Sequence, residues 1–420
     1  MTQLIDLPLE TLHHIAWQLS SRYRESAQDV QQEFQDGLTF ARHSEKLTAL
    51  SRLSRTCRHL RDIVQPILFH SVFDTEQTCV SLITTLNKRP DLANAVAELQ
   101  VQGKGVSDDC DPATTEPSKE QSMLIELLSR HFQTETQQPP SLNGDESTTK
   151  VNPYAALLIA LTPNVKRLHV EVGYWGLPTY QPGSLRCLKE LSLAHQDTEL
   201  GFDLADFYGV VQAAPALETL GCHMIANVSS TLVHENLTSL QIQYSCLTNE
   251  NLQRLVTELP KLERFSYSSA GAVVNDEPEA TPREIFEAIR LRSSTLKHLH
   301  VDLQLAVYME EPGERDIIPS LACMQALQTL EISALALAVD GEATDGNVLT
   351  NALPSSIRSF TLLDPHGCMT EDISRLAEAE RFPLLKEVSF YHPSNQPLEI
   401  ATEPFVSRGI RCSNKGPFSW

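Results

Sequence analysis

Two histidines offer the nearest approach to a metal-binding pattern in this sequence. His298 and His300 alternate with apolar residues, as in a strand with one buried face. At this spacing both imidazoles point to the same side of the strand and lie close enough to hold one metal ion. Beyond Asp302, no acid or cysteine stands at ligand spacing. We therefore expect solvated surface histidines, with no metal and no other cofactor.

The short motifs of common catalytic sites are absent from the sequence. No Gly-x-Ser-x-Gly elbow, His-Glu-x-x-His pair, Gly-x-x-x-x-Gly-Lys loop or Gly-x-Gly-x-x-Gly turn occurs at a strand–helix junction. These motifs position nucleophiles, zinc ligands and phosphate groups in the enzymes that use them. We expect a protein without catalytic activity of its own.

Composition favours a protein that binds other proteins. The 54 acidic against 33 basic residues give a net charge of -21, which repels nucleic-acid phosphates. No apolar run reaches the about 18 residues that cross a bilayer, and the start at Met1 lacks a secretory signal. The cysteines are scattered without Cys-x-x-Cys pairs, as is typical of a reducing compartment. We expect a cytoplasmic or nuclear protein that binds neither nucleic acid nor membrane.

Two apolar stripes of helical spacing stand near the N-terminus. Asp6 and Pro8 favour a helix start, and Glu10 suits the positive end of a helix. The first stripe consists of Leu12, Ile15, Ala16 and Leu19. The second, which we expect Pro66 to end, consists of Leu47, Leu50, Leu53, Cys57, Leu60 and Val64. Such short helices bury little surface by themselves, so part of a stripe is expected to contact a partner.

These residues together resemble the F-box family in its fungal style. The matching residues are Leu7-Pro8-x-Glu10-x-Leu12-x-x-Ile15-x-x-x-Leu19, Leu47-x-x-Leu50-Ser51-x-Leu53-Ser54-Arg55-Thr56-Cys57-Arg58-x-Leu60-Arg61 and Val64-x-Pro66-Ile67-Leu68-Phe69. The resemblance implies binding to the Skp adaptor of SCF-type cullin-RING ubiquitin ligases, and through it to the cullin and RING subunits. It implies an adaptor-binding set of Leu7, Pro8, Leu12, Ile15, Leu19, Leu50 and Cys57.

The segment between the two stripes departs from the family. The segment of residues 21–46 is much longer than the connection that the family usually has between these helices. It is an exposed loop, an extension of a helix, or the result of an error in the gene model. We expect a helical module over residues 1–75 with this segment as an insert. The alternative is that both helices simply cap the domain that follows.

A pattern of the form Leu-x-x-Leu-x-Leu recurs from residue 96 onward. The copies begin at Val96, Val165, Leu188, Leu217, Leu237, Leu262, Leu296, Leu327, Ile357 and Leu385. The last two apolar positions of each copy alternate with polar residues, which indicates one strand per copy. Helix signals stand between copies, at Thr248, at the capping box Thr281-Pro282-Arg283-Glu284 and at Thr370.

Alternating strands and helices predict an α/β fold with parallel strands. The pattern resembles leucine-rich repeats, and the combination resembles the F-box/leucine-rich-repeat substrate receptors. This resemblance implies an irregular solenoid over residues 76–420, with parallel strands on the concave face and helices on the convex face. The asparagine or cysteine usual three residues past the last leucine is largely missing, so other groups must satisfy the backbone there. A compact α/β domain with coincidental spacing is the alternative.

The composition changes between residues 103 and 152. Ser, Thr, Pro, Glu and Gln dominate, interrupted by an amphipathic stretch at residues 123–128. We expect a disordered insertion that carries one short helix. It is either a regulatory or docking segment or an insertion that the fold tolerates.

In a repeat of this kind, the polar residues between the buried positions face outward from the sheet. The candidate substrate-binding residues on this face are Arg167, His169, Glu190, His223, Gln241, Arg264, His298, His300, Glu331 and Tyr391. Their mixed chemistry does not identify a ligand. The leading hypothesis is a substrate-recognition subunit of an SCF-type ubiquitin ligase that binds an unknown protein target. The alternative is a leucine-rich-repeat scaffold without coupling to a ubiquitin ligase.

Overall fold

The structure is a computed structural model, and it divides the chain into two compact units. It describes residues 7–20, 47–73, 78–102, 119–132, 151–173, 175–195, 201–269, 279–303, 316–339, 344–365, 369–392 and 400–415. One unit comprises Met1–Gln196 with Asp206–Leu217, and the other comprises Asp197–Ala205 with Glu218–Ser419. The expected insert at 21–46 and most of the expected insertion at 103–152 lie outside the described residues.

The residues described at the start of the first unit form three helical segments. Helix α1 spans Leu9–Leu19 with Pro8 as its N-cap, residues 47–54 are helical, and α4 spans Arg58–Leu68. The second apolar stripe is therefore divided, because the Cys57 side chain caps α4 by accepting from the Leu60 N–H at 3.5 Å.

The prediction that Pro66 ends the second helix is wrong, because Pro66 lies inside α4. An internal proline costs about 3 kcal/mol. Ile67 follows it and is only 5% exposed, and burying such a side chain contributes about 2 kcal/mol. Packing of the last turn thus offsets much of the cost of the proline.

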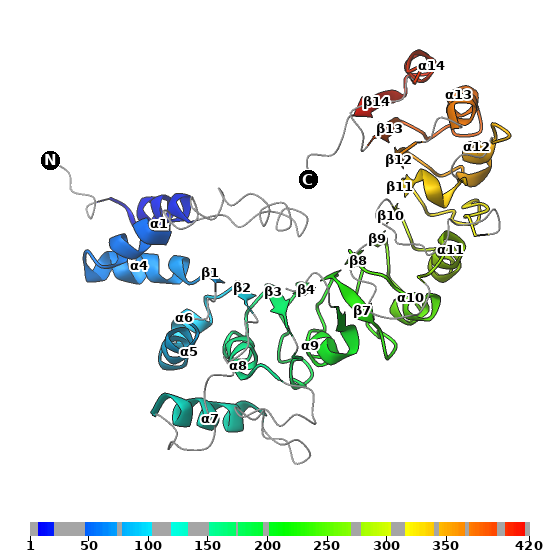
Figure 1. Cartoon of the computed structure of the whole chain (residues 1–420). Helices are drawn as coiled ribbons and strands as arrows, with labels where there is room; N and C mark the ends of the chain where they lie inside the picture. Colours follow the sequence, from blue (N-terminus) through cyan, green and yellow to red (C-terminus); the bar gives the residue numbers. More distant parts are fainter. Residues whose placement is uncertain are drawn as a thin grey trace. The chain divides into compact units, whose positions relative to one another are not determined.

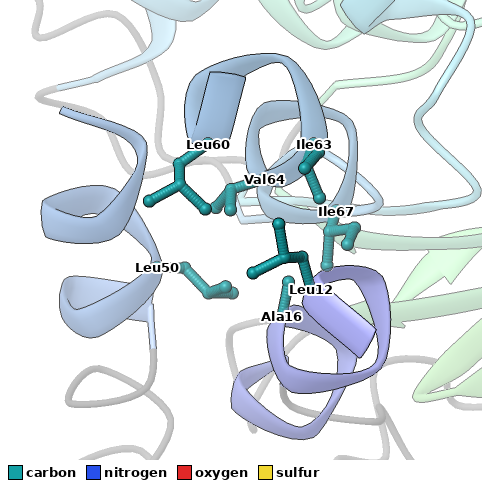
Figure 2. Close-up of a cluster of buried hydrophobic side chains, with 7 residues drawn as sticks. All are labelled: Leu12, Ala16, Leu50, Leu60, Ile63, Val64 and Ile67. Carbon is teal, nitrogen blue, oxygen red and sulfur yellow. The ribbon is translucent and has the colours of Figure 1, made fainter. Parts of the chain in front are cut away.

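A small core joins these helices. Leu12 and Ala16 from α1 and Leu50 from the 47–54 helix point toward the apolar face of α4 (Figure 2). That face is formed by Leu60, Ile63, Val64 and Ile67. Leu7, Leu19, Leu53, Cys57 and Leu68 pack around this core and stay partly exposed.

Four parallel strands complete the sheet of the first unit. They run in chain order as β1 (Ser71–Phe73), β2 (Glu98–Val101), β3 (Arg167–Val172) and β4 (Glu190–His195). Helices α5 (Cys79–Lys88), α6 (Pro90–Ala93) and α8 (Pro153–Leu161) lie on one side of these strands (Figure 1). Helix α9 (Tyr208–Ala213) also belongs to this unit.

Helix α8 is buried between α7 and the rest of the first unit. Its sequence PYAALLIAL is apolar all round, and its side chains from Ala155 to Ile159 are fully buried. Helix α7 (Lys119–Phe132) packs against it, and the Phe132 ring lies 5.4 Å from the Tyr180 ring in an edge-on contact. The amphipathic stretch expected at 123–128 is thus the centre of a longer, packed helix.

The second unit contains a longer run of parallel strands. In order these are β6 (Thr219–His223), β8 (Ser239–Gln243), β9 (Arg264–Ser268), β10 (His298–Asp302), β11 (Thr329–Ser333), β12 (Ser359–Leu363), β13 (Glu387–Tyr391) and β14 (Arg411–Lys415). A separate parallel pair joins β5 (Phe202–Asp203) and β7 (Ile225–Asn227). Every strand predicted from the repeat pattern is present, so the α/β class is confirmed. Strands β1, β5, β7 and β14 were not predicted.

Helices of the second unit lie along one side of its strands (Figure 1). They are α10 (Asn249–Val256), α11 (Pro282–Arg290), α12 (Val348–Ala352), α13 (Thr370–Glu378) and α14 (Glu403–Ser407). The predicted starts at Thr248 and Thr281 are confirmed: Thr248 caps α10, and Thr281 forms a complete capping box with Glu284. The helix predicted to run from Thr370 is also confirmed, because α13 begins at this residue.

Serine side chains satisfy backbone groups near the ends of the strands, and one of them stands where the usual asparagine is missing. Ser245 stands three residues past Ile242, and its hydroxyl accepts from the Ile225 N–H at 3.0 Å. Ser333 accepts from the Leu303 N–H at 2.8 Å. Both serines are 1% exposed. Because a buried N–H without a partner is costly, these bonds stabilise the turns that leave the strands.

The same turns hold non-glycine residues in a left-handed conformation. Met224, Tyr244 and Asp364 have φ of 67°, 48° and 49°, and each lies two residues past the last apolar position of its repeat. The Met224 N–H donates to the Gln243 carbonyl at 3.0 Å, and the Asp364 N–H donates to the Tyr391 carbonyl at 2.7 Å. Hydrogen bonds to the neighbouring repeat therefore hold a conformation that is unfavourable for a single residue.

Candidate protein-interaction surfaces

The expected adaptor-binding residues differ in how far they are buried within the N-terminal module. Leu12 and Leu50 are 3% and 0% exposed and form the core of the module. Pro8 is exposed, and Ile15 is partly exposed. Leu7, Leu19 and Cys57 are partly buried against the core. The side chains of Leu12 and Leu50 face α4, and their part in adaptor binding stays a prediction.

Two other residues dominate the outside of α1. Leu9 is 49% exposed and Trp17 is 37% exposed. With the exposed His13 they form a stripe at four-residue spacing. This stripe was not predicted from the sequence, because only the apolar stripe of Leu12 and its neighbours was considered. The Trp17 ring also lies edge-on to the His70 ring, at 5.0 Å between centroids. We call Pro8, Leu9, His13, Ile15 and Trp17 the α1 surface.

In each unit, the polar residues of the strands line a sheet face. None of the expected substrate-binding residues is buried, while the apolar residues that alternate with them, such as Leu299 and Val301, are. In the first unit, Arg167 lies opposite Glu98 on one side and Glu190 on the other. In the second unit, His300 lies opposite Ser266 and Glu331. Tyr391 stands at the end of β13, opposite Leu363.

Several side chains of the sheet faces have polar partners. Arg167 forms an ion pair with Glu98, and the Ser71 hydroxyl donates to the same carboxylate at 2.6 Å. Arg411 lies 3.1 Å from Glu387. His300 Nδ1 lies 2.9 Å from the Glu331 carboxylate. The His169 ring lies 3.0 Å from the Ser192 hydroxyl.

His298 and His300 do not form a metal centre with the described residues. Across that part of the chain, no three His, Cys, Asp or Glu side chains gather at ligand distance. His300 is engaged by Glu331, as described above. Burial, followed by the nearby charge of Arg264, lowers the pKa of His298.

A buried carboxyl group at the ends of β8 and β9 was not anticipated. The Ser269 hydroxyl donates to Glu279, and the Tyr267 hydroxyl lies 3.3 Å from the same oxygen and 2.8 Å from the Ser245 carbonyl. Burial raises the pKa of Glu279 to about 7. Burial and then the charge of Glu279 raise the pKa of the Cys246 thiol to about 11. A thiol with such a pKa is a poor nucleophile at neutral pH.

No protein-family model and no curated protein matches this sequence. Among the helices that the structure describes, none combines the length and apolar character of a membrane span. The chain is thus defined by its fold and its surfaces: an α/β protein with parallel strands in repeated units, a helical N-terminal module and a polar sheet face.

Proposed function

We propose that this chain is a non-catalytic substrate-recognition subunit of an SCF-type ubiquitin ligase. The N-terminal module binds the Skp adaptor, and the strand–helix repeats, arranged as an irregular leucine-rich-repeat solenoid, bind a target protein. The mechanism is proximity, because tethering the target beside the ligase raises its effective concentration at the site of transfer.

The observation that carries the proposal is the α1 surface. Leu9 and Trp17 expose large apolar side chains on a short helix whose own core is already filled by Leu12 and Ala16. Exposed aromatic and aliphatic residues of this kind serve as anchors in protein interfaces. Of the α1 surface, the F-box resemblance places Pro8 and Ile15 in the adaptor-binding set, and we extend that set to Leu9 and Trp17 because they are exposed.

The test is copurification of the full chain with the Skp adaptor and cullin. Leu9→Asp places a charge on the outside of α1, and we expect it to abolish adaptor binding while the circular dichroism spectrum stays unchanged. Ile125→Asp is the matched control, because Ile125 is 45% exposed on α7. Unchanged adaptor binding by Leu9→Asp contradicts the proposal.

A scaffold without ubiquitin-ligase coupling is the second candidate. It is favoured by the length of residues 21–46, which departs from the family between the two matching helices. Binding of the adaptor without recruitment of the cullin, or a target whose ubiquitination is unchanged when the chain is deleted, would support this candidate.

A further inference from the structure

Arg264, on the sheet face, has no acidic partner among the residues that the structure describes. Arg167 and Arg411, on the same face of their strands, are paired with Glu98 and Glu387. Arg264 stands at the start of β9, is exposed, and forms no ion pair with any residue that the structure describes. The adjacent carboxylate of Glu263 is 2.7 Å from Lys297 and is thereby neutralised.

The neighbours of Arg264 are hydrogen-bonding groups. His298 is its partner in register on β10, so the two side chains lie side by side at the spacing of neighbouring strands, about 5 Å. Ser266 lies on the same face of β9, two residues further along, and Gln241 faces it from β8. Within the described part of the chain, the side chains of His298, Ser266 and Gln241 form no hydrogen bond.

The carboxylate of Glu331, on the same sheet face, also has a partner. Glu331, two strands from Arg264, lies 2.9 Å from His300. Among the residues that the structure describes, Arg264 is therefore a cation without an ion-pair partner on a polar sheet face, in a chain whose net charge is -21. An isolated cation surrounded by donors is complementary to an anionic group.

We propose that the sheet face of β8, β9 and β10 binds an acidic segment of a partner protein. A carboxylate or phosphate group of that segment pairs with the Arg264 guanidinium and accepts hydrogen bonds from His298 and Ser266. This inference rests on the proposed function, since it names the chemistry of the target that the repeats recognise.

The experiment measures binding of three fluorescent peptides to the purified full chain by anisotropy. The peptides share one Gly-Ser scaffold and carry glutamates, phosphoserines or glutamines at the same positions. We expect at least one acidic peptide to bind about five-fold more tightly than the glutamine peptide, with a preference that weakens as salt is added. The glutamate and phosphoserine arms distinguish the two sources of the anion.

Arg264→Gln is expected to remove the preference for the acidic peptide. Arg411→Gln is the matched control, because it makes the same charge change on the same face at an arginine that already has a partner. Equal losses in both variants, equal binding of the glutamine peptide, or no binding by any peptide would each overturn the inference. The peptide measurement does not depend on adaptor binding, because no adaptor is present in it. The Leu9→Asp variant tests adaptor binding separately.

Discussion

The Ser333 hydroxyl joins two neighbouring repeats by accepting a hydrogen bond from the Leu303 N–H at 2.8 Å. The same hydroxyl lies 3.3 Å from Asp302 Oδ1, to which it donates. Ser333 and Leu303 are 1% and 0% exposed. Water therefore cannot replace the serine as a partner of this N–H.

Ser333→Ala is expected to lower the free energy of unfolding by about 1–3 kcal/mol, because it leaves a buried N–H without an acceptor. Chemical denaturation followed by circular dichroism measures the change. Ser359→Ala is the control: Ser359 is partly exposed on the sheet face, and a change within about 0.5 kcal/mol is expected there. Equal destabilisation by both variants would contradict the role assigned to Ser333.

Glu279→Gln is expected to alter how stability depends on pH. Burial raises the pKa of Glu279 from 4.5 to about 7, so the folded protein binds this proton more tightly than the unfolded chain does. The wild type therefore loses stability as pH rises from about 4.5 to about 7, and the glutamine variant lacks this loss. Relative to the wild type, the free energy of unfolding of the variant should rise by on the order of 2 kcal/mol by pH 8.

Urea unfolding of both proteins across this pH range measures the difference. The exposed carboxylate of Glu235 provides the control variant Glu235→Gln, whose stability difference should vary less because solvent screens the charge. A constant difference between Glu279→Gln and wild type at all pH values would refute the prediction.

Thiol reactivity should separate Cys323 from Cys246. Cys323 is exposed, whereas burial and then Glu279 raise the pKa of the Cys246 thiol to about 11. Since the thiolate is the reactive form, iodoacetamide at pH 8 is expected to modify Cys323 first. Mass spectrometry of the labelled peptides measures the order, and removal of the Glu279 charge should speed the labelling of Cys246. Faster labelling of Cys246 than of Cys323 in the folded protein would be inconsistent with this arrangement.

Two substitutions on helix α7 test whether it is an integral part of the first unit. Phe132 is 6% exposed and contacts the Tyr180 ring, whereas Ile125 is 45% exposed. We expect Phe132→Ala to cost about 3 kcal/mol and to increase hydrogen exchange in α8, because a cavity opens beside it. Ile125→Ala should cost less than about 1 kcal/mol. If both variants exchange like wild type, α7 does not protect α8.

Local patterns in the sequence were sufficient for the α/β class and for most strands. The alternation in repeats such as Leu296-x-x-Leu299-x-Val301 requires one buried face, and a strand is the local structure that provides it. The capping box at Thr281 is likewise a local signal, since all its hydrogen bonds lie within four residues. Strands β1 and β14 could not be predicted, because they lack the full repeat pattern and depend on pairing with β2 and β13.

Only the tertiary structure decided which surfaces are free. An apolar stripe shows that a helix must be covered, but it does not distinguish cover by the same chain from cover by a partner. Packing against α4 buries Leu12 and leaves Leu9 exposed. Similarly, the sequence contains many arginines, but the register between strands distant in the chain pairs Arg167 with Glu98 and leaves Arg264 beside His298. Ion pairing across strands depends on which residues lie opposite each other, and that relationship exists only once the sheet has formed.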